Sequence, residues 1–105
     1  TTGSYNTGLG QQALYSNTTG YGNTSSGYVS TYTNQTGIYN TAYGYQSLYY
    51  ATSSQNTACG AFALMNTAAG AYNTALGYQA GDVITSGGYK MPLGLNLQMS
   101  EKRKI

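Results

Sequence analysis

The sequence has 105 residues, which allows one domain at most, and charged side chains make up 6% of it, against about 25% in average proteins. None occurs before Asp82, and four of the six lie in the last five residues, so the net charge of +2 describes a tail. Nucleic-acid binding needs Lys and Arg spread over a footprint, so that function is excluded. No run of about 18 apolar residues occurs, and insertion of a helix into a membrane is not expected.

The composition favours β-structure with many turns. Fifteen Gly and abundant small polar residues suit a disordered chain, but thirteen Tyr are too many aromatic residues for one. Gly and Asn favour turns, and Tyr favours strands. The single cysteine, Cys59, excludes a disulfide within the chain. We expect it to be a small buried apolar residue, because other copies of the repeat described next carry Leu or Tyr there.

A repeat of 17 residues recurs along positions 1–89. Its marker is a glycine whose copies are spaced by 17, 17, 16, 17 and 17 residues: Gly10, Gly27, Gly44, Gly60, Gly77 and Gly94. An asparagine stands four residues earlier in the first five copies: Asn6, Asn23, Asn40, Asn56 and Asn73. Another column holds Gly3, Gly20, Gly37, Gly70 and Gly87, with Ser53 or Ser54 in the shortened repeat. A helical pair takes about 33 residues, so this unit suits one coil of a β-solenoid. We predict an all-β protein, a parallel β-solenoid (β-helix or β-roll) of about six such coils.

Stacked coils place equivalent residues above one another, so each column of the repeat becomes a face of the solenoid. Three columns are predicted to point inward. The first precedes the marker glycine: Leu9, Ser26, Tyr43, Cys59, Leu76 and Leu93. The others follow it by three and four residues: Ala13, Ser30, Ser47, Ala63, Ala80 and Leu97, then Leu14, Thr31, Leu48, Leu64, Gly81 and Gln98. Because most of these residues are small, the core is thin, and we expect assembly with other chains.

The asparagine and tyrosine columns also have predicted roles. Asparagine amides hydrogen-bond along stacked strands, Asn and the Thr that follows it suit a turn, and the marker glycine supplies positive φ. The tyrosines are expected to face outward or to lie at an interface: Tyr5, Tyr39, Tyr72 and Tyr89; Tyr28, Tyr45 and Tyr78; Tyr15, Tyr32 and Tyr49. Because tyrosine is amphipathic, Tyr28, Tyr45 and Tyr78 predict packing between chains or stacking on sugar rings.

Residues for catalysis are scarce. The chain has no His, and its two carboxylate side chains, Asp82 and Glu101, are separated by more than one coil. We therefore predict no catalytic triad, no glycosidase pair, no metal site and no cofactor, and we expect no enzyme activity. Three N-glycosylation sequons begin at Asn17, Asn23 and Asn34, which are candidate glycan sites if the chain is secreted through a glycosylating pathway.

Residues 90–105 depart from the repeat. Lys90 and Met91 replace the Asn-Thr pair, and Pro92 cannot donate to a strand ladder. This predicts a degenerate sixth coil that caps an otherwise adhesive solenoid end, followed by a charged C-terminal tail.

The phrase NTALGYQAG, from Asn73 to Gly81, resembles the repeats of phage tail-fibre and tail-spike shafts, as do the NTTG and TTGSYNTG phrases between its copies. It is also similar to the head repeats of trimeric autotransporter adhesins, whose pattern is roughly N-S-x-A-I-G followed by a small residue. The matching positions are Asn73, Thr74, Ala75, Leu76, Gly77 and Ala80, with their counterparts in earlier copies. The resemblance covers residues 1–90 and implies a β-solenoid, commonly trimeric, that serves as shaft or adhesive surface outside a cell or on a virion. The final SEKRKI resembles the S-D-x-R-L-K start of the self-cleaving chaperone domain that follows many fibre shafts, with Glu101 in place of Asp and the Leu missing.

Three functions follow as expectations. The first is a structural segment of an extracellular, cell-surface or virion fibre that self-associates as a homotrimer or filament. The alternative is an adhesin module that binds cell-surface glycans through Tyr and Asn/Thr stripes. The third is an ice-binding solenoid, which needs a flat Thr face and is disfavoured by the neighbouring Tyr. Because the faces carry no charge, we expect assembly to depend weakly on salt.

Overall fold

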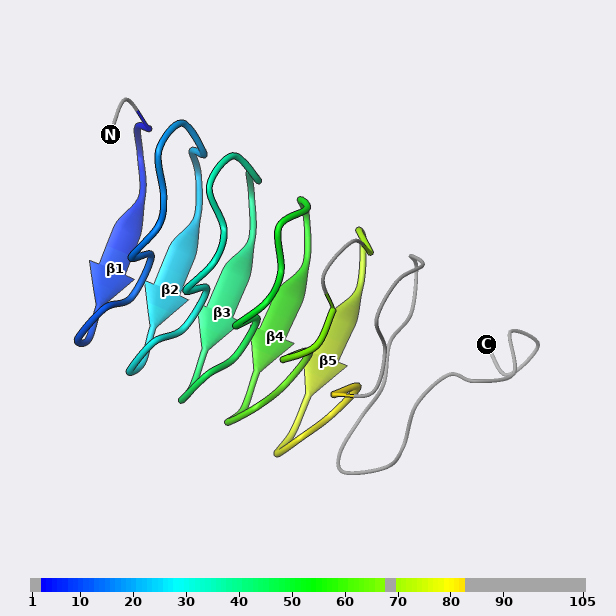
Figure 1. The fold of residues 1–105 in the computed structure, drawn as a ribbon. Helices are drawn as coiled ribbons and strands as arrows, with labels where there is room; N and C mark the ends of the chain where they lie inside the picture. The colour runs from blue at the N-terminus through cyan, green and yellow to red at the C-terminus, as the bar shows by residue number, and fades with distance from the viewer. Residues whose placement is uncertain (1–2, 68–69, 83–105) are drawn as a thin grey trace.

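Five short parallel strands organise the structure, a computed structural model that describes residues 3–67 and 70–82. The strands are β1 (Thr7–Leu9), β2 (Thr24–Ser26), β3 (Thr41–Tyr43), β4 (Thr57–Cys59) and β5 (Thr74–Leu76). They form one sheet in the order β1-β2-β3-β4-β5, and each neighbouring pair is parallel. The chain winds round once between successive strands, so that similar coils lie side by side along one axis (Figure 1). The predicted all-β, parallel β-solenoid is confirmed.

The number of coils differs from the predicted one. The described residues hold five strands and about four turns, against the six coils predicted. The sixth marker, Gly94, and the cap and tail predicted for residues 90–105 lie outside the described residues, as does the predicted boundary at residue 89.

The shortened repeat keeps the register of the sheet. Thr41 in β3 pairs with Thr24 in β2 and with Thr57 in β4, so equivalent residues remain opposite each other although the spacings differ. The Asn40 amide donates to the carbonyl of Ser53, where the preceding coil uses Gly37. Ser53, rather than Ser54, therefore takes the place of glycine, and the omitted residue falls in the turn before it.

The part of each coil after the strand is built from residues in the left-handed region of φ. The marker glycine comes first, with φ of 133° at Gly44. Two further columns follow, and their non-glycine members are Gln12, Val29, Gln46, Phe62 and Gln79, then Leu14, Thr31, Leu48 and Leu64. A left-handed residue other than glycine costs about 1–2 kcal/mol, so this conformation needs support from neighbouring coils. Backbone N–H groups supply it: Leu48 donates to Ala63 at 3.0 Å, and Gln46 donates to Tyr28 at 3.1 Å.

The turn predicted at the Asn-Thr pair is displaced by one residue. The residue before each asparagine has positive φ, as at Tyr39 (57°) and Tyr72 (62°), whereas the asparagines do not appear among the left-handed residues. The threonine after each asparagine opens the strand, as Thr41 does in β3. Asparagine thus stands between a tight turn and a strand, where its side chain points into the coil.

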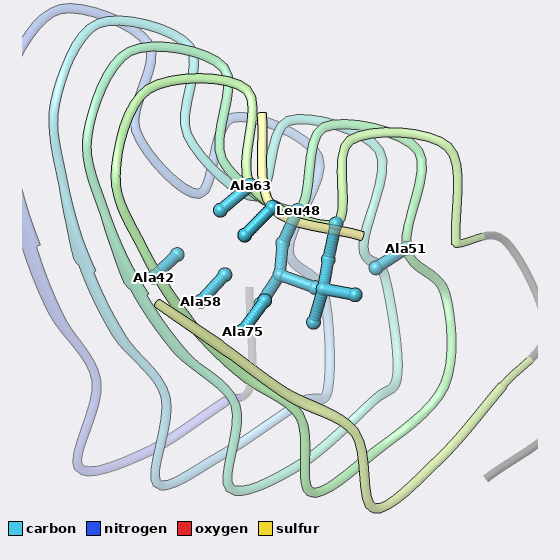
Figure 2. Packing of buried hydrophobic residues seen from close by; sticks show 8 residues of the cluster. Ala42, Leu48, Ala51, Ala58, Ala63 and Ala75 are labelled. Carbon is cyan, nitrogen blue, oxygen red and sulfur yellow. The ribbon is translucent and has the colours of Figure 1, made fainter. Parts of the chain in front are cut away.

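The core lies between the strand and the opposite wall of each coil. Leu48, Leu64, Ala63 and Ala80 have no exposed surface, so the two inward columns predicted after the marker glycine are confirmed in the interior coils. Alanines from β3, β4 and β5 form a row that faces Leu48 across the interior (Figure 2): Ala42, Ala58 and Ala75. The core is as thin as predicted, because most of its side chains are alanine or serine.

The third predicted inward column is wrong. Leu9, Tyr43 and Leu76 are 64%, 62% and 55% exposed, so the residue before the marker glycine points outward. The reason is the strict alternation of side chains in a strand, which places the central residue of each three-residue strand inside and its neighbours outside. Cys59 belongs to the outward column and is half-exposed, which also corrects its predicted burial.

Candidate functional site: the asparagine ladder and the tyrosine columns

The asparagine ladder consists of one asparagine per coil, each bonded to the coil that follows. The Oδ1 atom of Asn23 accepts the backbone N–H of Asn40 at 2.9 Å, and its Nδ2 atom donates to the carbonyl of Gly37 at 2.9 Å. The other members that make the Oδ1 contact are Asn6, Asn40 and Asn56. The predicted ladder therefore exists, but it runs from amide to backbone rather than from amide to amide.

Burial makes these hydrogen bonds important for the fold. Asn23, Asn40, Asn56 and Asn73 are at most 1% exposed. A buried polar group left without its partner costs about 1–3 kcal/mol, so each coil depends on the next one to satisfy its asparagine. The ladder couples neighbouring coils and offers no group for chemistry on a substrate.

Glycine is required where coils approach most closely. A Cβ atom at Gly44 would lie 2.6 Å from the carbonyl carbon of Gly60, and one at Gly10 would lie 2.9 Å from that of Gly27. Such distances leave no room for a side chain, and the positive φ of these residues disfavours one independently. The predicted role of the marker glycine in a positive-φ bend is confirmed for the five copies in the described residues.

The three sequon asparagines lie in the wall of the solenoid. Asn23 and Asn34 are at most 1% exposed, and the Nδ2 atom of each donates to the carbonyl of Gly37. Asn17 is half-buried and donates to Gly20 at 3.1 Å. A glycan is attached through Nδ2, so glycosylation of Asn23 or Asn34 requires this part of the coil to open.

The tyrosine columns face outward in the described coils, as the repeat predicts. Tyr28, Tyr45 and Tyr78 are 47%, 42% and 56% exposed. The rings of Tyr28 and Tyr45 are stacked with centroids 5.7 Å apart and planes 11° from parallel. Phe62 continues the row by edge contacts with Tyr45 at 5.2 Å and Tyr78 at 5.9 Å. Phe62 was not among the predicted residues, although an aromatic residue in a column that otherwise holds Gln or Val was its signal.

A second row, Tyr15, Tyr32 and Tyr49, is named the tyrosine stack. Its ring centroids are 4.9 and 5.1 Å apart, and neighbouring planes differ by only 9° and 3°. Tyr50 meets the Tyr49 ring edge-on at 4.7 Å. Because the rings cover one another along the solenoid axis, their edges rather than their faces are left for contacts with another molecule.

The phenol of Tyr49 connects the two rows electrostatically. Partial burial raises its pKa above the ordinary value, and the phenols of Tyr32, Tyr50, Tyr28 and Tyr45 raise it further. An ionised Tyr49 would face several neighbouring phenols, so the tyrosine stack and the Tyr28–Tyr45 row lie on one part of the surface. This surface is uncharged at neutral pH.

The strand face carries a row of threonines in exact register with one another. The members are Thr7, Thr24, Thr41, Thr57 and Thr74, and all are exposed. The parallel row beside them is irregular, since it contains Leu9, Tyr43 and Leu76. Only one of the two rows on this face therefore repeats without change.

The fold and these columns define a class, the parallel β-solenoid repeat proteins. Across residues 3–67 and 70–82, no three residues of His, Cys, Asp or Glu come together in a way that holds a metal ion. Within the same ranges, no helix has the length and apolarity needed to cross a membrane. No protein-family model, curated protein or solved structure matches the chain.

Proposed function

We propose that this chain is a structural repeat segment of an extracellular or virion fibre. The observation that carries the proposal is the asparagine ladder, in which every interior asparagine is buried and bonded to the following coil. A structure built from such identical contacts gains length and stiffness by adding repeats, since each coil contacts only its neighbours. The resemblance of NTALGYQAG to fibre-shaft repeats supports the same function and the location outside the cell or on a virion.

Self-association is part of this proposal. The thin alanine core stabilises a lone solenoid weakly, and the strand face exposes apolar side chains at Leu9, Tyr43 and Leu76. A homotrimer or filament that covers this face adds the missing apolar burial. Residues 3–81 contain no charged side chain, so such contacts depend on shape, hydrogen bonds and tyrosine packing.

The experiment is a measurement of size and shape in solution. Sedimentation and negative-stain images of the purified chain should show elongated oligomers that persist in about 1 M NaCl, where ionic contacts are screened. Replacing Leu9 and Leu76 by Thr should weaken association, whereas Tyr5→Ser, at an equally exposed position off the strand face, should not. Compact 11.1 kDa monomers under all conditions would contradict the proposal.

Glycan binding remains the second candidate, supported by the exposure of Tyr28, Tyr45 and Tyr78. The stacking of Tyr28 on Tyr45 covers ring faces that a sugar would use, so binding would rest on ring edges and hydroxyl groups. Binding to a glycan array that disappears in Tyr45→Ala and Tyr78→Ala would favour this function. Ice binding ranks third, because the row beside the threonines is irregular; thermal hysteresis in solution would be its test.

A further inference from the structure

The tyrosine stack holds three phenols in a geometry that favours reaction between them. Tyr15, Tyr32 and Tyr49 occupy one column of three successive coils, and hydrogen bonds between the coils fix their backbones. Ser16 donates to the carbonyl of Tyr32 at 3.2 Å, and Thr33 donates to that of Tyr49 at 3.1 Å. The side chain of Tyr15 is 60% exposed, and the other two are half-buried, so dissolved oxidants reach the stack.

We propose that the tyrosine stack is a site of oxidative cross-linking, at which Tyr32 forms a dityrosine bond with Tyr15 or Tyr49. A one-electron oxidant removes an electron from each phenol, and each hydroxyl loses its proton. The unpaired electron of a phenoxyl radical is shared between oxygen and the ring carbons beside it. Two such carbons form a C–C bond, and each then loses its hydrogen as a proton that returns to a phenol oxygen. The product lacks two hydrogen atoms, and hydrogen peroxide, the oxidant of a peroxidase, takes them up as two molecules of water.

The ring spacing selects this site over other tyrosines. Centroids 4.9 and 5.1 Å apart keep the reacting carbons near each other before oxidation, and holding two reactants together raises their effective concentration by orders of magnitude. Tyr43 is equally exposed, at 62%, but Ser26 and Cys59 are its neighbours along the column. Tyr43 therefore reacts chiefly with other molecules, whereas Tyr32 reacts within its own chain.

The bond would act as a staple between consecutive coils. It would close a loop of 17 residues in the unfolded chain, as a disulfide of that span does, and so disfavour unfolding. The repeat thus gains a covalent connection without a second cysteine.

The test is oxidation of the dilute, folded chain with a peroxidase and hydrogen peroxide. Monomeric product is isolated, its loss of two hydrogen atoms is measured by mass spectrometry, and the cross-linked peptides are identified after proteolysis. We expect Tyr32 linked to Tyr15 or Tyr49 as the main product, and a higher urea midpoint for the linked monomer. Tyr32→Phe keeps the ring stack but should lower formation of these links several-fold, whereas Tyr43→Phe should leave their yield unchanged.

Unfolding the chain in urea before oxidation separates geometry from tyrosine content. The proposal requires the Tyr32 links to fall several-fold under those conditions. Equal yields from folded and unfolded chains, or links spread evenly over all tyrosines including Tyr43, would overturn it. The same holds if dityrosine forms only between molecules, with a yield that rises with protein concentration.

Discussion

The coil that contains β2 and the coil that contains β4 have the same backbone and opposite interiors. The first buries Ser25, Ser30 and Thr31, and the second buries Ala58, Ala63 and Leu64. In the β2 coil, the Ser25 hydroxyl bonds to Ser30 at 2.5 Å and to Thr31 at 3.1 Å, so the polar side chains satisfy one another. The shape of a coil therefore does not depend on an apolar interior.

What the two coils share is the contact with their neighbours. Asn23 and Asn56 each donate from Nδ2 to a glycine carbonyl of the next coil at 2.9 Å. Gly27 and Gly60 occupy the same bend, with φ of 128° and 130°. The asparagine and glycine columns thus specify the coil, while the interior columns adjust its stability.

The most severe test of this comparison is Gly44→Ala. Its Cβ would lie 2.6 Å from the Gly60 carbonyl carbon, and its φ of 133° is unfavourable for alanine. Overpacking and backbone strain together predict a loss of about 4 kcal/mol in the free energy of unfolding, measured by urea denaturation. Gly8→Ala is the control, because a Cβ there meets its nearest atom, Leu14 Cδ1, at an ordinary 3.5 Å. Equal losses for the two variants would show that coil spacing is not set by the bend glycine.

The interiors are compared by changing their polarity. Leu48→Ala removes a fully buried side chain, and we expect it to cost about 3 kcal/mol through lost burial and the cavity left behind. In the β2 coil, the triple variant Ser25→Ala, Ser30→Ala, Thr31→Val removes all partners of the hydroxyl cluster and should change stability by less than about 1 kcal/mol. Thermal and urea unfolding measure both. A large loss from the triple variant would mean that the hydroxyl cluster, and not the shared ladder, holds that coil.

The ladder itself is tested at two of its members. Asn40→Ala removes the acceptor for the Asn56 N–H and the donor to the Ser53 carbonyl, both at a buried site, and should cost about 2 kcal/mol. Asn6 makes the same two contacts with Asn23 and Gly20 but is half-buried, so water can replace part of the loss. Asn6→Ala should therefore cost about half as much. Indistinguishable urea midpoints for the two variants would contradict the role assigned to burial.

The sequence predicts those features that depend on spacing. The constant distance between asparagines fixed the register of β1 to β5, and the column of Leu48 and Leu64 was correctly placed inside. It failed where apolar character and geometry disagree: Leu76 is apolar but stands at the outer position of a three-residue strand. Apolar residues on an outward column have no local signal that distinguishes them from a core.

The left-handed turns were predicted only where glycine marks them. Leu48 and Leu64 adopt φ of 51° and 50°, although leucine has no preference for that region. Hydrogen bonds between coils and burial of the side chain outweigh the local cost, and neither is visible in one repeat taken alone. The ring contacts of Phe62 were missed for the same reason, since they depend on the coils above and below it.

The smallest effect expected separates the tyrosine surface from the strand face. The raised pKa of Tyr49 means that the folded chain keeps this proton at a pH where the unfolded chain, with a tyrosine pKa of about 10, has lost it. Above that pH the unfolded state binds fewer protons than the folded state, so the free energy of unfolding falls as pH rises through the folded pKa. Urea midpoints measured from about pH 9 to about pH 11 should therefore decline less steeply in Tyr49→Phe than in the parent chain. Tyr43→Phe, on the strand face, is the matched control and should reproduce the parent's decline. An identical slope in all three chains would show that crowding of the phenols around Tyr49 has no effect on folding, and the difference between the two faces would then lie in packing alone.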